Sequence, residues 1–525
     1  MHNINTCILL VAVMALNISC ADRPEVINRN YNELHRPQFH FSPAEKWTND
    51  PNGLVYYEGE YHLFYQYYPD STVWGPMHWG HAVSTDLIQW EHLPIALYPD
   101  SLGYIFSGSA VIDWNNTSGL GTASSPPMVA IYTYHDPVGA KAGRLDYQTQ
   151  GIAYSTDKGR TWVKYEGNPV IANPGIPDFR DPKVSWHPAF DKWIMTLAVK
   201  DHVSFYSSDD LITWQFESDF GKELGAHGGV WECPDLFKMK VDDTGEEKYV
   251  LLVSINPGGP NGGSATQYFV GQFDGNTFQP DPAFLPQVTG TDSGGQARAV
   301  WIDHGKDNYA GVTFSDAPDG RHIFIGWMSN WQYANVVPTE TWRNAMTLPR
   351  DLHLTKHNNS YILRSQPVPE LVMLRKDTAI SVINSREDLI PFGPDGLEAD
   401  ITFSEITDDC GVTLSNGKEN ITIGIDYSNG RLFVDRTNSG MSEFSSHFQG
   451  IHYAGIPDLD KPIKMHLFID RSSLEVFLND GETVMTEIFF PTANYDLLNV
   501  YAENESIKIQ GKGHHLHSTW AQNNE

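Results

Sequence analysis

The stretch Ser84-Thr85-Asp86-Leu87-Ile88-Gln89-Trp90 decides the fold, because it recurs later in the chain. In Ser208-Asp209-Asp210-Leu211-Ile212-Thr213-Trp214 the Ser, Asp, Leu, Ile and Trp stand at matching positions. A third copy, Ser155 to Trp162, carries one extra residue, and Gly271 to Phe278 is a degenerate fourth. The first three copies follow short segments typical of strands. Repeated strand–turn–Trp units indicate the blades of a β-propeller, although chance hairpins in a large sandwich would look similar.

The composition agrees with a chain built from short strands. Of the 525 residues 40% are hydrophobic, and 32 Pro and 44 Gly interrupt the sequence too often for long helices. Almost no segment keeps the helical period of 3.6 residues. The length allows two or more domains with cores of their own. We therefore predict an all-β protein with more than one domain.

The character of the sequence changes after Leu348-Pro349-Arg350. We predict that residues 37–352 form the propeller and that residues 353–370, which contain the Pro-rich stretch Gln366-Pro367-Val368-Pro369, form a linker. Residues 371–518 alternate apolar and polar side chains over short spans, which indicates a C-terminal β-sandwich.

The first residues resemble an export signal. Residues 7–16 (CILLVAVMAL) are apolar but too short to span a bilayer. The following Asn17-Ile18-Ser19-Cys20 resembles a bacterial lipoprotein cleavage site, at which Cys20 would be acylated and become the mature N-terminus. We predict a signal peptide over residues 1–20, a polar tether over residues 21–36, and an exported lipoprotein at the cell envelope. The alternative is a buried N-terminal helix.

The charge and the cysteines limit the partners. A net charge of −30 argues against nucleic acid or an anionic lipid surface, so we predict no nucleic-acid partner and membrane contact only through a lipid on Cys20. The four cysteines form neither a disulfide framework nor a zinc pattern. Asp303 to Asp307 resembles a calcium loop but lacks its bidentate Glu, which favours a turn. We predict no metal and no cofactor.

Three acidic residues stand one or two positions before a proline at the edge of an apolar segment: Asp50, Asp181 and Glu232. In Trp47-Thr48-Asn49-Asp50-Pro51-Asn52-Gly53, Pro51 fixes its own φ and pushes Asp50 toward an extended conformation. Each acid taken alone fits a turn residue bonded to its own backbone. The three together, among aromatic residues that can stack on sugar rings, fit glycoside hydrolysis, which needs one ionised and one protonated carboxyl group.

The propeller gives these acids a way to meet, because the innermost strand of each blade faces the central channel. Like charges that pack together raise the pKa of one carboxyl group, which would let Glu232 serve as an acid. Arg180 stands beside Asp181 and would keep that carboxyl group ionised. Cys233, next to Glu232, lacks His and Asn partners for a nucleophile and favours a small buried thiol.

In combination and order, four blocks of the sequence resemble family 32 of the glycoside hydrolases, the β-fructofuranosidases. The blocks are Trp47 to Gly53, Phe106-Ser107-Gly108-Ser109-Ala110, Phe179-Arg180-Asp181-Pro182 and Trp231-Glu232-Cys233-Pro234. The resemblance covers most of residues 37–350. Thr48 departs from the family, which usually has an apolar residue there. The resemblance implies a five-bladed β-propeller followed by a β-sandwich, and hydrolysis with retention of configuration.

The resemblance also implies roles for individual residues. Asp50 would be the nucleophile, Glu232 the acid and base, and Asp181 the stabiliser of the transition state, with Arg180 binding substrate and supporting the acids. The remaining residues of the fructosyl subsite would be Asn49, Gln66, Trp74, Phe106 and Ser107.

The expected substrates are fructans (levan, inulin or both) and sucrose. A funnel at a propeller axis holds a chain end, which favours release of fructose from that end. An endo-levanase or endo-inulinase, a fructosyltransferase, and a non-catalytic glycan-binding lipoprotein stay open. The Gly-rich stretch Asn256 to Gly263 is predicted to be a flexible loop near the rim of the pocket.

Overall fold

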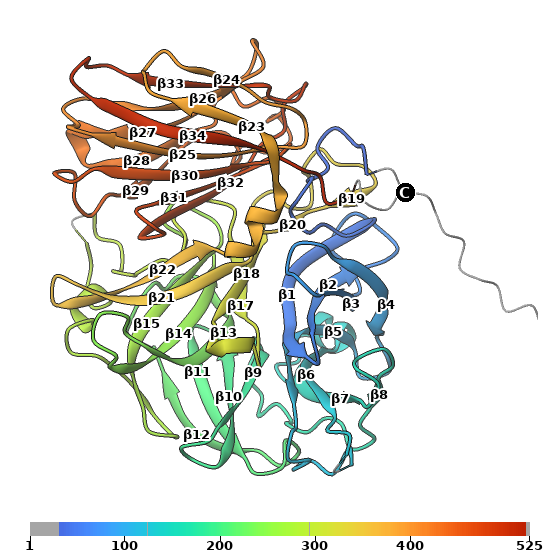
Figure 1. Cartoon of the computed structure of the whole chain (residues 1–525). Coiled ribbons are helices and arrows are strands. Elements are labelled where there is room, and N and C mark those ends of the chain that lie inside the picture. Colours follow the sequence, from blue (N-terminus) through green and yellow to red (C-terminus); the bar gives the residue numbers. More distant parts are fainter. Residues whose placement is uncertain (1–30, 123, 293, 521–525) are drawn as a thin grey trace, which may run out of the picture. The chain divides into compact units, whose positions relative to one another are not determined.

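The computed structural model describes residues 31–122, 124–292 and 294–520 (Figure 1). The regular structure in these ranges is almost entirely β-strand, and the one α-helix among them is the short α1 (Pro137–Lys141). No helix in the same ranges is long and apolar enough to cross a bilayer. The predicted signal peptide and Cys20 lie outside the described residues.

The end of the predicted tether belongs to the folded part of the chain. Arg36 is buried, and its guanidinium donates to the carbonyl of Pro43 at 2.7 Å. His35 Nε2 lies 2.9 Å from the carbonyl oxygen of Pro491. Residues 33–36, which were predicted to belong to the tether, are therefore part of the folded unit that begins at Glu33.

Within the described residues, five antiparallel sheets follow one another between Lys46 and Pro367, coloured blue to yellow in Figure 1. The first contains β1 (Lys46–Tyr57), β2 (Glu60–Tyr68), β3 (His78–Ser84) and β4 (Glu91–Leu97), and the second β5 (Tyr104–Ile112), β6 (Met128–His135), β7 (Gln148–Ser155) and β8 (Val163–Lys164). The third contains β9 (Phe179–His187), β10 (Lys192–Val199), β11 (His202–Ser208) and β12 (Gln215–Phe220), and the fourth β13 (Val230–Lys240), β14 (Glu247–Asn256), β15 (Ala265–Phe273) and β16 (Phe278–Pro280). The fifth contains β17 (Tyr309–Thr313), β18 (Ile323–Met328), β21 (Arg350–His357) and β22 (Ser360–Pro367), with β20 (Ala345–Met346) paired to β18.

The first strands of these sheets form a closed ring. β1 contacts β5, β5 contacts β9, β9 contacts β13, β13 contacts β17, and β17 contacts β1. The short β19 (Trp342–Arg343) pairs in parallel with β1 and ties the end of this region to its start. This is the arrangement of a β-propeller, in which the first strand of each blade lines the centre.

The repeated sequence forms the turn between the third and fourth strands of a blade. Asp86 Oδ1 accepts from the backbone N–H of Ile88 at 2.9 Å, and Trp90 Nε1 donates to the carbonyl of Leu87 at 3.1 Å. The copy at Ser208–Trp214 makes the same bonds through its own Asp and Trp. The sequence repeat is therefore one turn with a fixed hydrogen-bond pattern, in which an Asp side chain replaces a backbone acceptor.

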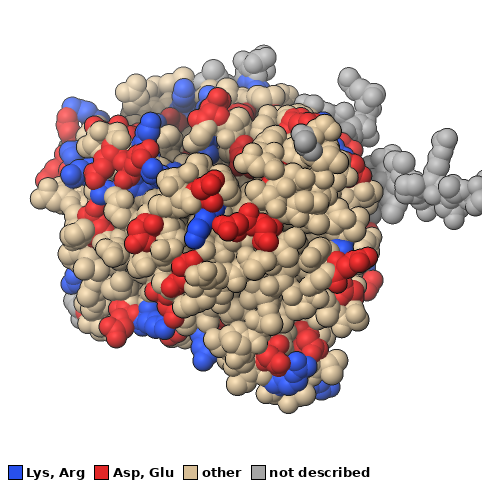
Figure 2. Space-filling view, turned by 90° about the horizontal axis from the view of Figure 1, so that it is seen from below, with Lys and Arg blue, Asp and Glu red and all other residues tan. Residues whose placement is uncertain are grey.

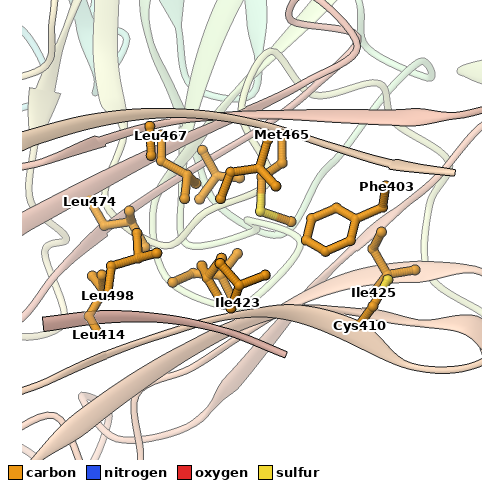
Figure 3. Packing of buried hydrophobic residues seen from close by; sticks show 14 of the residues in the cluster. Phe403, Cys410, Leu414, Ile423, Ile425, Met465, Leu467, Leu474 and Leu498 are labelled. Atoms are coloured by element: carbon orange, nitrogen blue, oxygen red, sulfur yellow. The ribbon is translucent and has the colours of Figure 1, made fainter. Parts of the chain in front are cut away.

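Two six-stranded antiparallel sheets form the second region, coloured orange to red in Figure 1. One contains β23 (Arg375–Ile383), β34 (Lys508–Leu516), β25 (Leu397–Ser404), β30 (Ile463–Ile469), β31 (Ser473–Leu478) and β32 (Thr483–Ile488). The other contains β24 (Leu389–Pro391), β33 (Leu497–Ala502), β26 (Cys410–Ser415), β27 (Asn420–Asp426), β28 (Arg431–Asp435) and β29 (Ile451–Gly455). Figure 3 shows Phe403 and Met465 of the first sheet facing Ile423 and Leu498 of the second, which is the core of a β-sandwich.

The structure differs from the prediction between the two regions. The predicted linker, residues 353–370, is instead most of the hairpin β21–β22 and the start of a 3₁₀ turn, η3 (Pro369–Leu374). Its prolines do not break the sheet, because Pro367 ends an edge strand, where no ladder bond is lost. The remaining short turns are η1 (Leu285–Gln287), η2 (Pro318–Gly320) and η4 (Tyr427–Asn429).

A buried ionic network joins the two regions. Arg350 of β21 donates to Asp303 at 2.9 Å and to Glu475 of β31 at 2.6 Å. Glu475 also lies 3.0 Å from His40 Nε2, whose Nδ1 is 2.8 Å from Asp470. Asp303 begins the stretch that resembles a calcium loop in sequence. In the structure its carboxyl group accepts a hydrogen bond from the guanidinium of Arg350.

Charged side chains are mixed on the face shown in Figure 2. Acidic and basic groups lie among wide uncharged areas, and no continuous basic patch is seen on that face. This distribution suits a neutral ligand better than a polyanion.

Candidate active site

A cavity of about 320 Å³ opens at the ring of first strands, and its wall contains every residue predicted for the substrate site. These residues are Asn49, Asp50, Gln66, Trp74, Phe106, Ser107, Arg180, Asp181 and Glu232. The wall also contains Asn256, the first residue of the loop predicted near the rim, and five residues to which the sequence assigned no role: His135, Tyr147, Gln148, Asp178 and Trp331.

β-Bulges place the acids at this cavity. The pairing of each first strand with its neighbour shifts register near the cavity end, within the segments 48–51, 105–108, 180–183, 232–235 and 309–312, and β1 shifts a second time within 52–55. A bulge interrupts the ladder and redirects a side chain, and it accepts a proline because no ladder bond is needed there. The acid–proline pairs noticed in the sequence are these bulges.

Asp50 is fixed by two donors. Asn49 Nδ2 donates to Oδ1 at 2.8 Å, and Ser107 Oγ donates to Oδ2 at 2.7 Å. Asn49 is itself held by the indole N–H of Trp47, which donates to Oδ1 of Asn49 at 2.8 Å. Gly53 lies within β1 at its second register shift and has a φ of +58°, and a Cβ there would lie only 2.8 Å from the ring of Phe64. The carboxylate is therefore held in one orientation.

Glu232 shares its two oxygens between a guanidinium and a phenol. Arg180 donates to Oε1 through Nη2 at 2.6 Å and through Nε at 3.2 Å, and the hydroxyl of Tyr309 donates to Oε2. Arg180 also donates through Nη1 to Asp178 at 2.5 Å. Burial raises the pKa of Glu232, Arg180 opposes this change, and the carboxylate of Asp50 adds to it.

Arg180 was predicted to keep Asp181 ionised, and it does lower the pKa of Asp181, but burial outweighs this effect. The Nε of Arg180 lies 3.9 Å from Asp181 Oδ2, while its short contacts go elsewhere. Asp181 Oδ2 accepts instead from the backbone N–H of Cys233 at 3.1 Å. Burial and the carboxyl groups of Glu232 and Asp50 raise the pKa of Asp181 despite Arg180. The crowded carboxyl groups therefore retain a proton to higher pH than isolated ones would.

Cys233 lies between the two aspartates. Its sulfur is 3.7 Å from Asp50 Oδ2 and 3.8 Å from Asp181 Oδ2, and the residue is buried. Burial and these carboxyl groups raise the pKa of the thiol well above its usual value. A protonated thiol is a poor nucleophile, which agrees with its interpretation as a small buried side chain.

Aromatic rings complete the wall. The rings of Phe106 and His135 stack with centroids 4.4 Å apart, and Trp74 meets Phe106 edge-on. Trp331 stacks on Trp47 with centroids 5.9 Å apart. Burial lowers the pKa of His135 to about 4, so this ring is neutral near pH 7. A sugar unit in the cavity would therefore meet apolar ring faces beside charged groups.

Comparison with known proteins agrees with this geometry. The model described as "Glycosyl hydrolases family 32 N-terminal domain" matches residues 40–367, and "Glycosyl hydrolases family 32 C terminal" matches residues 371–515. The chain belongs to glycosyl hydrolase family 32. It is thus a glycosidase, and the predicted β-propeller followed by a β-sandwich is confirmed.

Relatives of this family member match over nearly the whole of this chain. A levanase of Bacillus subtilis is 45% identical over 97% of this chain and 74% of its own length. An extracellular exo-inulinase of Aspergillus niger is 39% identical over 94% of this chain and 96% of its own. The crystal structure of exo-inulinase from Aspergillus awamori superimposes with a TM-score of 0.86 at 37% identity, covering 93% of this chain and all of the other.

Proposed function

We propose that this glycosidase releases fructose from the ends of fructans (levan, inulin or both) and from sucrose, with retention of configuration. The observation that carries the proposal is the meeting of Asp50, Asp181 and Glu232 at one cavity. Relatives named levanase and exo-inulinase support the choice of substrate.

The proposed mechanism uses the two fixed carboxyl groups in turn. Asp50 attacks C2 of the fructosyl unit while Glu232 gives its proton to the departing oxygen, which breaks the glycosidic bond and leaves a fructosyl ester on Asp50. Glu232, now ionised, takes a proton from water, whose oxygen attacks C2 and releases Asp50. Asp181 accepts hydrogen bonds from ring hydroxyls as positive charge develops. Two inversions give net retention.

The cavity favours attack at a chain end. Its volume of about 320 Å³ is at the lower end of the range of about 300–1,000 Å³ for ligand pockets. Such a volume fits a terminal sugar unit better than a polymer that passes through.

We also propose export with a lipid anchor on Cys20. The Aspergillus niger relative is an extracellular exo-inulinase, which supports export, and the sequence before Cys20 supports the anchor. Labelling of cells with a radioactive fatty acid tests the anchor. We expect label on the wild-type protein and none on Cys20→Ala, whereas equal labelling of both proteins would contradict it.

A time course on levan, inulin and sucrose tests the activity. We expect free fructose alone from the first time point, with Asp50→Asn as the inactive blank. Early oligosaccharides of several lengths would show endo action, and longer oligofructosides formed from concentrated sucrose would show transfer. Fructose release by Asp50→Asn at the wild-type rate would overturn the assignment of Asp50 as the nucleophile. If the wild type released no fructose, the non-catalytic glycan-binding alternative would be favoured.

A further inference from the structure

Two loops of the cavity wall are held by the β-sandwich. Segment 256–264 begins with the cavity residue Asn256, and segment 329–337 carries the cavity residue Trp331. Both connect elements of the propeller, yet side chains in each bond to residues of the second region.

The two loops support each other directly. Asn330 Nδ2 donates to the carbonyl of Gly262 at 3.4 Å, and the backbone N–H of Trp331 donates to Ser264 Oγ at 3.2 Å. Gly263 has a φ of +76°, and a Cβ there would lie 2.2 Å from the amide of Asn330. Only glycine fits at position 263, because the two loops touch there without any gap. A displacement of segment 329–337 would therefore displace segment 256–264.

The first attachment to the sandwich is a buried ionic group. The hydroxyl of Tyr333 donates to Asp307 Oδ1 at 2.5 Å. Arg436, which directly follows β28, donates to this hydroxyl at 3.0 Å and to Asp307 Oδ2 at 2.7 Å. All three side chains are buried, and the guanidinium also lies 4.3 Å from the ring centroid of Phe448. Charge-assisted bonds shielded from water hold Tyr333, two residues from Trp331, in one place.

The second attachment resembles a strand pairing. Asn261 Oδ1 accepts from the backbone N–H of Tyr453 in β29 at 3.0 Å, and its Nδ2 donates to the carbonyl of the same residue at 3.0 Å. The Asn256–Gly263 stretch was predicted to be flexible. It is instead fastened at Asn261.

We propose that the β-sandwich positions the cavity wall for catalysis, with Tyr333, Arg436 and Asn261 as positioning residues that act through Trp331 and Asn256. Trp331 stacks on Trp47, whose indole orients Asn49 beside the predicted nucleophile. A displacement of about 1 Å at such a wall can lower a rate about 10²-fold. The kinetic part of the proposal rests on the proposed function.

A double-mutant cycle tests whether Tyr333 acts through Trp331. We expect Tyr333→Phe to lower kcat/KM for fructose release about tenfold when Trp331 is present, but by no more than about twofold in a Trp331→Ala background. The matched control is Tyr268→Phe, which removes a buried hydroxyl that accepts from Leu363 N and lies away from the cavity. Equal losses from Tyr333→Phe in both backgrounds would overturn the proposal.

Hydrogen exchange tests the same proposal without any activity. We expect peptides covering residues 329–337 to exchange faster in Tyr333→Phe than in the wild type and in Tyr268→Phe. Unchanged exchange in Tyr333→Phe would overturn the proposal. If the wild type released no fructose while exchange rose as expected, the proposed function would fail and the attachment of the loop to the sandwich would stand.

Discussion

Two groups of buried carboxyl groups in this protein use the same residue types and differ in how their charge is balanced. At the contact between the regions, burial alone would raise the pKa values of Asp303 and Glu475, but Arg350 lowers both. At the cavity, the Arg180 side chain is 11% exposed, whereas that of Arg350 is fully buried, and the pKa values of Asp181 and Glu232 are raised.

The difference lies in the number of cations per carboxyl group. Asp303, Glu475 and Asp470 share two cations, Arg350 and His40. The carboxyl groups of Asp470 and Glu475 raise the pKa of His40 to about 9 against the effect of burial. At the cavity three carboxyl groups, and Asp178 beside them, crowd around one guanidinium. Where the carboxyl groups have enough cations beside them, they stay ionised and stabilise the fold. Where they outnumber the cations, one of them holds a proton that it can transfer. Four changes would separate the two groups, and the one with the strongest effect comes first.

Asp50→Asn separates activity from stability most strongly. We expect kcat to fall by at least about 10³-fold, because the amide is not a nucleophile. We expect Tm to stay equal or to rise, because one of several like charges is removed. Kinetics and thermal unfolding of the same preparation measure both. A large drop in Tm would show that the charge of Asp50 stabilises the fold, which would contradict the proposed difference between the cavity carboxyl groups and those around Arg350.

Arg350→Met has the opposite profile. It leaves Asp303 and Glu475 buried without their guanidinium, which costs about 3–5 kcal/mol of unfolding free energy. We expect denaturant unfolding at a lower midpoint and a kcat per folded molecule close to the wild type. A stable variant with impaired kcat would contradict the assignment of this network to the fold.

The pH dependence of stability reports His40. Its pKa is raised from 6.5 to about 9 in the folded protein. The stabilisation is therefore complete below about pH 6.5 and is lost as pH rises toward 9, by about 3 kcal/mol in total. We expect Tm of the wild type to fall across this window and Tm of His40→Gln to fall less. Parallel Tm curves for the two proteins would refute this prediction.

Tyr309→Phe is the mildest change. The hydroxyl donates to Glu232 Oε2 and favours the ionised carboxyl group, so its loss raises the pKa of Glu232 further. The acid then stays protonated to higher pH, and we expect the alkaline limb of kcat/KM to move up by about one pH unit. Tyr268→Phe serves as the control and keeps the wild-type profile. A downward shift in Tyr309→Phe would show that Glu232 is not the acid.

Local features of the fold and of the site could be predicted from the sequence. Asp86 and Trp90 specify a turn with neighbours only a few residues away, and the repeat therefore revealed the blades. The acid–proline pairs at Asp50 and Asp181 mark bulges for the same reason.

Features that depend on the distance between strands could not be predicted. Arg180 is adjacent to Asp181 in sequence, but the packing of β9 against β13 directs its guanidinium to Glu232. Trp331 and His135 reach the cavity only through tertiary packing, and an aromatic residue near a strand end was their only signal. The Pro-rich stretch at Gln366–Pro369 indicated a linker because sequence alone does not show that β22 is an edge strand.

The account is tested most directly by finding which carboxyl group bonds to the sugar. Glu232→Gln slows release of the fructosyl ester, whereas β-fructofuranosyl fluoride forms that ester without help from an acid because fluoride leaves unprotonated. A rapid acid quench during turnover of this fluoride by Glu232→Gln, followed by peptide mass spectrometry, therefore detects the adduct. The account predicts one added fructosyl unit on the peptide that contains Asp50. An adduct on the peptide that contains Asp181, or fructose release with no adduct on either, would contradict it.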